Sequence, residues 1–179
     1  HVPWRPHRHP QLGDVEIGGW NRFHAFSNPP PQCLARELAR FPRWLLWQAL
    51  TSPKLELVAA EAEALSGDCW RVRIVVQNTG WLPSYVSKRA LEHKVVRGAI
   101  AEIDLPPAAT LVQGKRREDV GQLEGKAFKH TGVSFWPDAH VTDDRVKVEW
   151  VVRAPSGTGV ALSVRHERAG VVRARVVLG

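Results

Sequence analysis

Alternation of apolar and polar residues dominates the chain from Lys54 onward. Between Trp70 and Gln77, large apolar residues at every second position alternate with Arg71 and Arg73. A period of two places alternate side chains on opposite faces of a β-strand, so this segment is predicted to be a half-buried strand. The same reasoning predicts further strands at Leu55–Ala64, Tyr85–His93, Ala99–Leu105, Leu111–Gly114, Val120–Glu124, Val146–Arg153, Val160–Glu167 and Val171–Leu178.

Turn-forming residues separate these segments. The last two are joined by Glu167–Gly170, a short connection that contains a glycine and suits a hairpin. Short strands at such intervals are typical of two antiparallel sheets packed face to face. The sequence therefore predicts a mainly β protein in which residues 54–179 form a β-sandwich.

A helical spacing precedes the strands. Apolar residues recur every three or four positions, as on one face of an α-helix, at Leu34, Leu38, Phe41, Leu45 and Ala49. Pro42 breaks or bends a helix unless it lies in the first turn of a second one. We therefore predict a helical region of residues 32–53, with helix over about 32–50, a bend near residue 41 and an exit at Pro53.

Residues 1–31 are rich in Pro, Gly, His and Trp and follow neither period. Disordered tails are normally poor in aromatic residues, whereas this segment contains several. We predict an extended arm that docks on the body of the protein or on a partner domain. Its candidate docking residues are the apolar ones, Trp4, Val15, Ile17, Trp20, Phe23 and Phe26.

Composition narrows the class of protein. A chain of 179 residues fits one domain with a docking segment, and no apolar run approaches the roughly 18 residues of a membrane span. The net charge of +7 is spread along the predicted strands, as on the solvent-facing side of a sheet. We therefore expect neither a nucleic-acid partner nor a membrane span. Because residue 1 is His and Met is absent, we also expect a processed protein or a piece of a longer one.

Motifs for catalysis and metal binding are missing from the sequence. None of the eight histidines begins an HxxE or HExxH pattern, and no GxSxG sequence is present. Cys33 and Cys69 lack zinc-finger spacing, which leaves two small buried thiols or a single disulfide as alternatives. We therefore expect no catalytic residue, no metal ligand and no cofactor in this chain.

Two tryptophans are candidates for ligand binding. Trp81 and Trp136 lie next to or near prolines in predicted loops, where exposed rings can bind sugars or peptides. The alternative is that each ring caps one end of the sandwich core.

Several motifs resemble known bacterial proteins. Val72–Pro83, which ends in Asn78-Thr79-Gly80-Trp81-Leu82-Pro83, is similar to immunoglobulin-like accessory domains. Its Asn and Gly suit the left-handed backbone of a tight turn. His9–Trp20, followed by Asn28-Pro29-Pro30, resembles the segment after the catalytic domain of bacterial M14 zinc carboxypeptidases. With the helix and Gly121–Gly125, the resemblance covers most of the chain.

The resemblance implies an immunoglobulin-like antiparallel β-sandwich attached to an M14 metallopeptidase. The expected function is that of a non-catalytic C-terminal domain, which packs on the peptidase domain of the same polypeptide and stabilises it. Zinc is expected in that domain only, and Glu16 is interpreted as part of the docking linker, not as a catalytic base. The alternative is a module that binds peptide, peptidoglycan or polysaccharide through Trp81 and Trp136.

Overall fold

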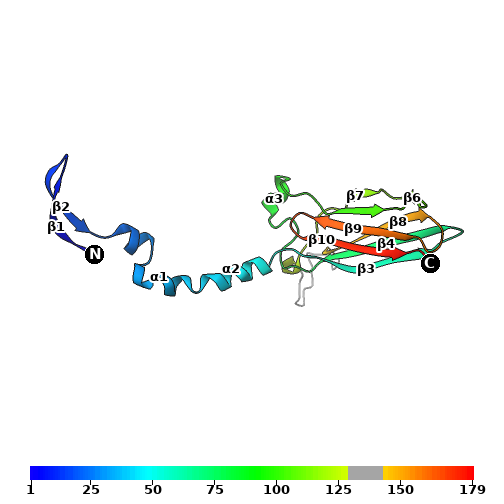
Figure 1. Ribbon diagram of the computed structural model, residues 1–179, viewed down its shortest axis with the longest axis horizontal. Helices are drawn as coiled ribbons and strands as arrows, with labels where there is room; N and C mark the ends of the chain where they lie inside the picture. The colour runs from blue at the N-terminus through cyan, green and yellow to red at the C-terminus, as the bar shows by residue number, and fades with distance from the viewer. Residues whose placement is uncertain (129–142) are drawn as a thin grey trace, which may run out of the picture. The chain divides into compact units, whose positions relative to one another are not determined.

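The computed structural model describes residues 1–128 and 143–179. The chain divides into two compact units, His1–Ala49 and Leu50–Gly179 (Figure 1). The larger unit contains the predicted sandwich, and the smaller unit contains the predicted arm and most of the helical segment.

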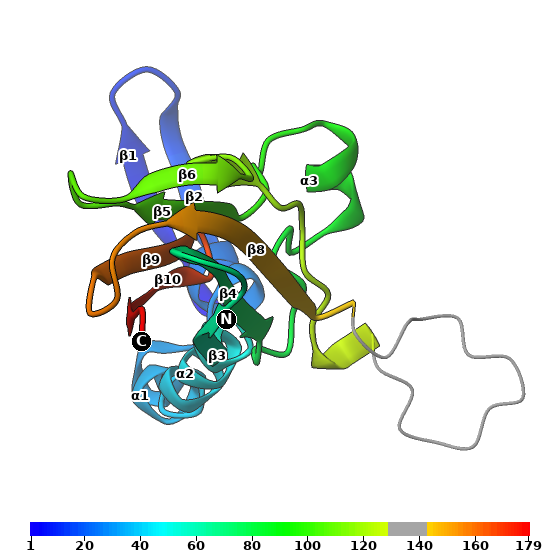
Figure 2. The ribbon, with the colours of Figure 1, turned by 90° about the vertical axis from the view of Figure 1, so that its right-hand side faces the viewer.

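Two four-stranded antiparallel sheets form the larger unit (Figure 2). The first sheet has the order β3-β4-β8-β6, with β3 Leu55–Ala64, β4 Cys69–Asn78, β8 Arg145–Arg153 and β6 Thr110–Gln113. The second has the order β10-β9-β5-β7, with β10 Gly170–Val177, β9 Gly159–His166, β5 Ile100–Asp104 and β7 Arg117–Asp119. The β-sandwich prediction is confirmed.

The core lies between the two sheets and follows the alternation seen in the sequence. Val72 and Ile74 of β4 are fully buried, and they pair in register with Trp150 and Val148 of β8. The intervening arginines of β4 point outward, where Arg71 and Arg73 pair with carboxylates of β3. The buried side chains from both sheets form one apolar cluster, whose removal from water stabilises the fold.

Two of the predicted strands are wrong. Within Tyr85–His93 the chain turns and forms the short helix α3, Lys88–Glu92, because the Ser87 side chain accepts the N–H of Ala90 and caps the helix. Val120–Glu124 is not a strand either. Its main chain bonds to Ala99, Ser84 and Asp143, which belong to three separate segments, and not to successive residues of one strand.

The smaller unit begins with a β-hairpin. Strands β1, Val2–His9, and β2, Gly13–Gly19, pair with each other, and a π-helical turn follows at Arg22–Ser27. The predicted extended arm is therefore extended, but much of it is paired into a hairpin. The sequence pattern hides this pairing because a bulge between Val2 and Arg5 interrupts the alternation.

Two helices complete this part of the chain. Helix α1 spans Pro31–Leu38 and α2 spans Phe41–Leu50, so the bend predicted near residue 41 is confirmed. Pro42 lies in the first turn of α2, where its missing N–H costs no helical hydrogen bond.

Candidate functional site

The Asn78 side chain is fully buried and lies at the centre of a polar network after β4. Its Oδ1 accepts the N–H groups of Lys54 and Gly80, at 2.9 and 3.0 Å. Its Nδ2 donates to the carbonyls of Leu82 and Glu124, at 2.9 and 3.0 Å. The Asn-x-Gly motif and the Gly121–Gly125 motif, which carry the resemblance, therefore meet at one buried amide.

Gly80 is needed for close packing and not for backbone conformation. The expected left-handed turn is wrong, because neither Asn78 nor Gly80 has a positive φ. A Cβ at position 80 would instead lie against the carbonyl oxygen of Ser52 and 2.6 Å from Pro53 Cα. The N–H of Leu82 also donates to the carbonyl of Thr51. Hydrogen bonds and close packing therefore fix residues 51–54, which follow α2, against the sandwich.

A second set of buried polar groups adjoins the first. The Ser84 hydroxyl donates to Gln122 Oε1 and accepts the N–H of Leu123. Gln122 Nε2 donates to the carbonyl of Val96, which fixes the orientation of the amide. His166 Nε2 lies 3.2 Å from Gln122 Oε1. Gln122 is part of the Gly121–Gly125 motif of the sequence, but neither Ser84 nor His166 was predicted, because these side chains share no local pattern.

His166 is held as a neutral ring. Its Nδ1 accepts the N–H groups of Arg168 and Ala169, so the proton is on Nε2, which faces Gln122. Burial lowers the pKa of His166 below its ordinary value of 6.5, and the charge of Arg168 acts in the same direction. The main chain of Arg97 and the carboxylates of Glu167 and Asp119 oppose the shift without cancelling it.

We expect the sandwich to lose stability as the pH falls below about 6.5. Below pH 6.5, the unfolded chain binds a proton on His166 more readily than the folded chain does. The free energy of unfolding is therefore highest above pH 6.5, and it falls as the pH approaches the lowered pKa of the folded state. His166→Asn cannot titrate, yet it keeps an acceptor for the two main-chain N–H groups. Urea unfolding from pH 8 to pH 5 should show a smaller decline for this variant, and equal declines would contradict the expectation.

The docking candidates lie on the smaller unit, and almost all of them are exposed. Trp20 and Phe26 are 79% and 86% exposed, Trp4, Ile17 and Phe23 are also exposed, and Val15 is half-buried. No described side chain of residues 1–49 is buried. This unit therefore has no core of its own among its described residues.

Helix α2 is apolar on all sides, which sequence analysis did not predict. In addition to the expected stripe it exposes Trp44, Leu46 and Trp47, and Arg43 is its one charged residue. A helix with apolar side chains around its whole circumference is normally surrounded by other protein.

Trp81 is 55% exposed in the loop after β4, so its ring does not fill the core. Trp136 lies outside the described residues. The structure therefore leaves Trp81 as a candidate for ligand binding but brings no second candidate to it.

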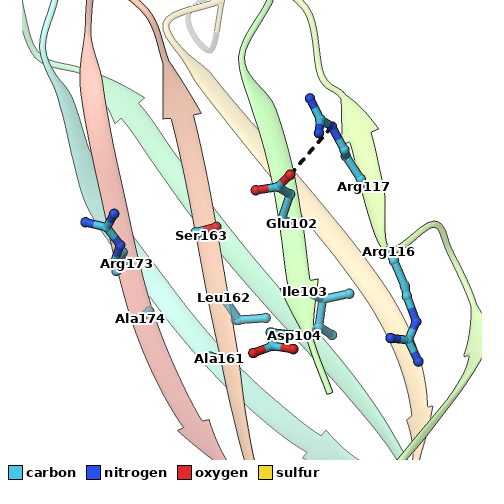
Figure 3. Close-up of a pocket in the computed structure, with 10 residues that line it drawn as sticks. All are labelled: Glu102, Ile103, Asp104, Arg116, Arg117, Ala161, Leu162, Ser163, Arg173 and Ala174. Atoms are coloured by element: carbon cyan, nitrogen blue, oxygen red, sulfur yellow. Dashed lines mark ion pairs between the residues drawn. The ribbon is translucent and has the colours of Figure 1, made fainter. Parts of the chain in front are cut away.

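A shallow groove crosses the outer face of the second sheet (Figure 3). Ser163 of β9 lies on its floor, with Arg173 of β10 on one side and Glu102 of β5 on the other. The Glu102 carboxylate lies 3.5 Å from both Arg117 and Arg165. The lining combines Arg116, Arg117 and Arg173 with Glu102 and Asp104. The groove therefore does not present charge of a single sign that would select a ligand.

Cys33 of α1 and Cys69 of β4 are both free and half-buried, so no disulfide joins them. Among residues 1–128 and 143–179, no group of three His, Cys, Asp or Glu side chains is placed to hold a metal ion. In the same part of the chain, no helix has the length and apolar character needed to cross a bilayer.

Comparison with known proteins places the larger unit in a family. No curated protein matches the chain. Residues 54–177 match the model of a family described as Domain of unknown function (DUF8731), and this match covers the whole sandwich from β3 to β10. The chain belongs to the DUF8731 family.

Proposed function

We propose that the chain is a non-catalytic accessory domain that packs on an M14-type zinc carboxypeptidase domain and stabilises it. One observation carries the proposal: residues 1–49 expose many apolar side chains and bury none of those described. Apolar surface of this extent marks a site of interaction with another protein.

The exposed aromatic area is large enough for a stable interface. Six aromatic side chains contribute, each at least half exposed: Trp4, Trp20, Phe23, Phe26, Trp44 and Trp47. At about 200 Å² for each whole side chain, their exposed parts amount to roughly 800 Å². One partner of a standard protein–protein interface buries about the same area. Aromatic side chains also carry much of the binding energy in such interfaces.

The resemblance of His9–Trp20 to the segment after M14 catalytic domains supports the choice of partner. In this proposal the zinc and the peptide-bond chemistry belong to the partner, since this sequence has no HxxE pair. The hydrogen bonds that hold residues 51–54 to the sandwich would then keep the arm attached to a rigid body.

Deletion of residues 1–28 removes four of the six exposed aromatic side chains and leaves those of α2, so it should leave a folded sandwich that associates much more weakly with the peptidase domain. The larger unit contains the whole apolar cluster, so its melting temperature should change by only a few degrees. Co-purification with the M14 domain, expressed as a separate chain, measures association. Undiminished association of the shortened protein would contradict the proposal.

Binding of peptide, peptidoglycan or polysaccharide is the second candidate function, and the exposure of Trp81 favours it. The same deletion separates the two functions. The shortened protein keeps Trp81, so a substrate-binding module would still bind its polymer with full affinity, whereas a docking domain would lose most of its affinity for its partner.

A further inference from the structure

We infer that the free edge of β2 accepts a strand from the partner, so that docking adds main-chain hydrogen bonds to the packing of aromatic side chains. The β2 edge is defined as the main-chain groups of Asp14 and Glu16 that point away from β1. The inference rests on the proposed function, because it describes how the arm would attach to the partner domain.

Pro6 determines which main-chain groups of the hairpin point outward. Pro6 pairs with Glu16 in the register of β1 and β2. Residue pairs of an antiparallel ladder alternate between hydrogen-bonded and non-hydrogen-bonded types. Because proline has no N–H, Pro6–Glu16 must be of the second type. The N–H and C=O of Glu16 therefore point away from β1, as do those of Asp14, two residues earlier.

The two edges of the hairpin differ in their capacity to bind a strand. On β1, Pro6 occupies an outward position and offers no donor, as is common on protected edge strands. On β2, Gly13–Gly19 contains no proline, so the outward donors and acceptors are intact. Among the described residues, β2 pairs with β1 alone. An added strand would therefore pair with β2.

The side chains of β2 indicate the chemistry of that strand. Val15 and Ile17 lie on one face of the hairpin, and Asp14 and Glu16 lie on the other. If two copies of β2 paired antiparallel around Glu16, their carboxylates would lie opposite each other and repel. Asp14 already pairs with Arg8 of β1, at 3.9 Å. Charge complementarity therefore favours an edge strand with a basic residue facing Glu16, and with apolar residues beside Val15 and Ile17.

Replacement of Glu16 by proline tests the β2 edge. Because the Glu16 N–H points outward, Glu16→Pro removes a donor from the edge and leaves the ladder of the hairpin intact. Val15, the preceding residue, is already extended, as a residue before proline should be. We expect affinity for the M14 peptidase domain to fall at least about tenfold, the effect of losing interfacial hydrogen bonds and blocking strand approach.

Two control variants separate main-chain pairing from other effects. Arg8→Pro places the same ring at an outward position of β1, which Pro6 already blocks, so binding should persist. Glu16→Gln removes the charge but keeps the N–H, and it should weaken binding much less than Glu16→Pro. Equal binding by Glu16→Pro and the unsubstituted protein would overturn strand addition and leave the docking function standing. If the unsubstituted protein does not bind, both proposals fail.

Amide hydrogen exchange of the unsubstituted chain gives a second test that does not depend on how a variant folds. In the free protein, the outward N–H groups of Asp14 and Glu16 should exchange quickly. In the complex they should become protected. A complex in which these two amides continue to exchange at the free rate would overturn the inference.

Discussion

Asn78→Ala is expected to lower the free energy of unfolding of the sandwich by about 3 kcal/mol or more. The amide satisfies four main-chain groups, which belong to Lys54, Gly80, Leu82 and Glu124. Each group loses its partner in the variant, and a buried polar group without a hydrogen bond costs about 1–3 kcal/mol. Urea unfolding monitored by tryptophan fluorescence gives the difference directly.

A second variant at position 78 and a control at position 79 sharpen the test. Asn78→Asp keeps acceptors for Lys54 and Gly80 but places an oxygen against the carbonyls of Leu82 and Glu124, so it should also be strongly destabilised. Thr79→Ala, at the half-buried neighbour whose hydroxyl donates to the Lys54 carbonyl over 3.4 Å, is the control and should cost at most about 1 kcal/mol. A small effect of Asn78→Ala would show that the buried amide does not organise this end of the sandwich.

Gly80→Ala is expected to be nearly as damaging, for a steric reason. The new methyl group would meet the main chain of Ser52 and Pro53, which cannot move without breaking the hydrogen bonds of residues 51–54. Overpacking of this kind costs about 1–3 kcal/mol or more. Thermal unfolding should show the loss, and hydrogen exchange should show faster opening at Lys54.

Gly159→Ala is the matched control for this steric argument. Its Cβ would also lie close to other atoms, 2.9 Å from the Arg175 side chain. That guanidinium is at the end of a flexible side chain and can move aside, so stability should change little. If the two glycine variants had equal effects, close approach to the main chain would not explain the need for glycine at position 80.

The sandwich was predictable because a strand that buries one face has apolar and polar residues in alternation along its sequence. The alternation from Trp70 to Val76 matches the buried face of β4, and the glycine at position 170 lies at the predicted hairpin between β9 and β10. Tyr85–His93 shows the limit of this reasoning. There a local helix cap at Ser87 determined the structure, and apolar residues alone could not reveal it.

The polar network was beyond sequence reasoning because its partners are distant in the chain. Asn78 bonds to Lys54, 24 residues away, and to Glu124, 46 residues away. The sequence motif predicted that Asn78 and Gly80 form a left-handed turn. The structure instead shows buried hydrogen bonds at Asn78 and close packing against the main chain at Gly80. The aromatic content of residues 1–31 predicted an extended arm that packs on the body of the protein or on a partner domain. The structure shows these aromatic side chains exposed, and their docking stays a prediction.

Pro6 limits how far assembly through the hairpin can proceed. A hairpin with two open edges could bind a strand on each side and link molecules into fibres. Pro6 blocks the outer edge of β1, whereas the outer edge of β2 is open. The hairpin can therefore pair with the edge strand of another sheet through β2, but it offers no second edge to a further strand. The arm would therefore form complexes of fixed size and end the sheet that it joins.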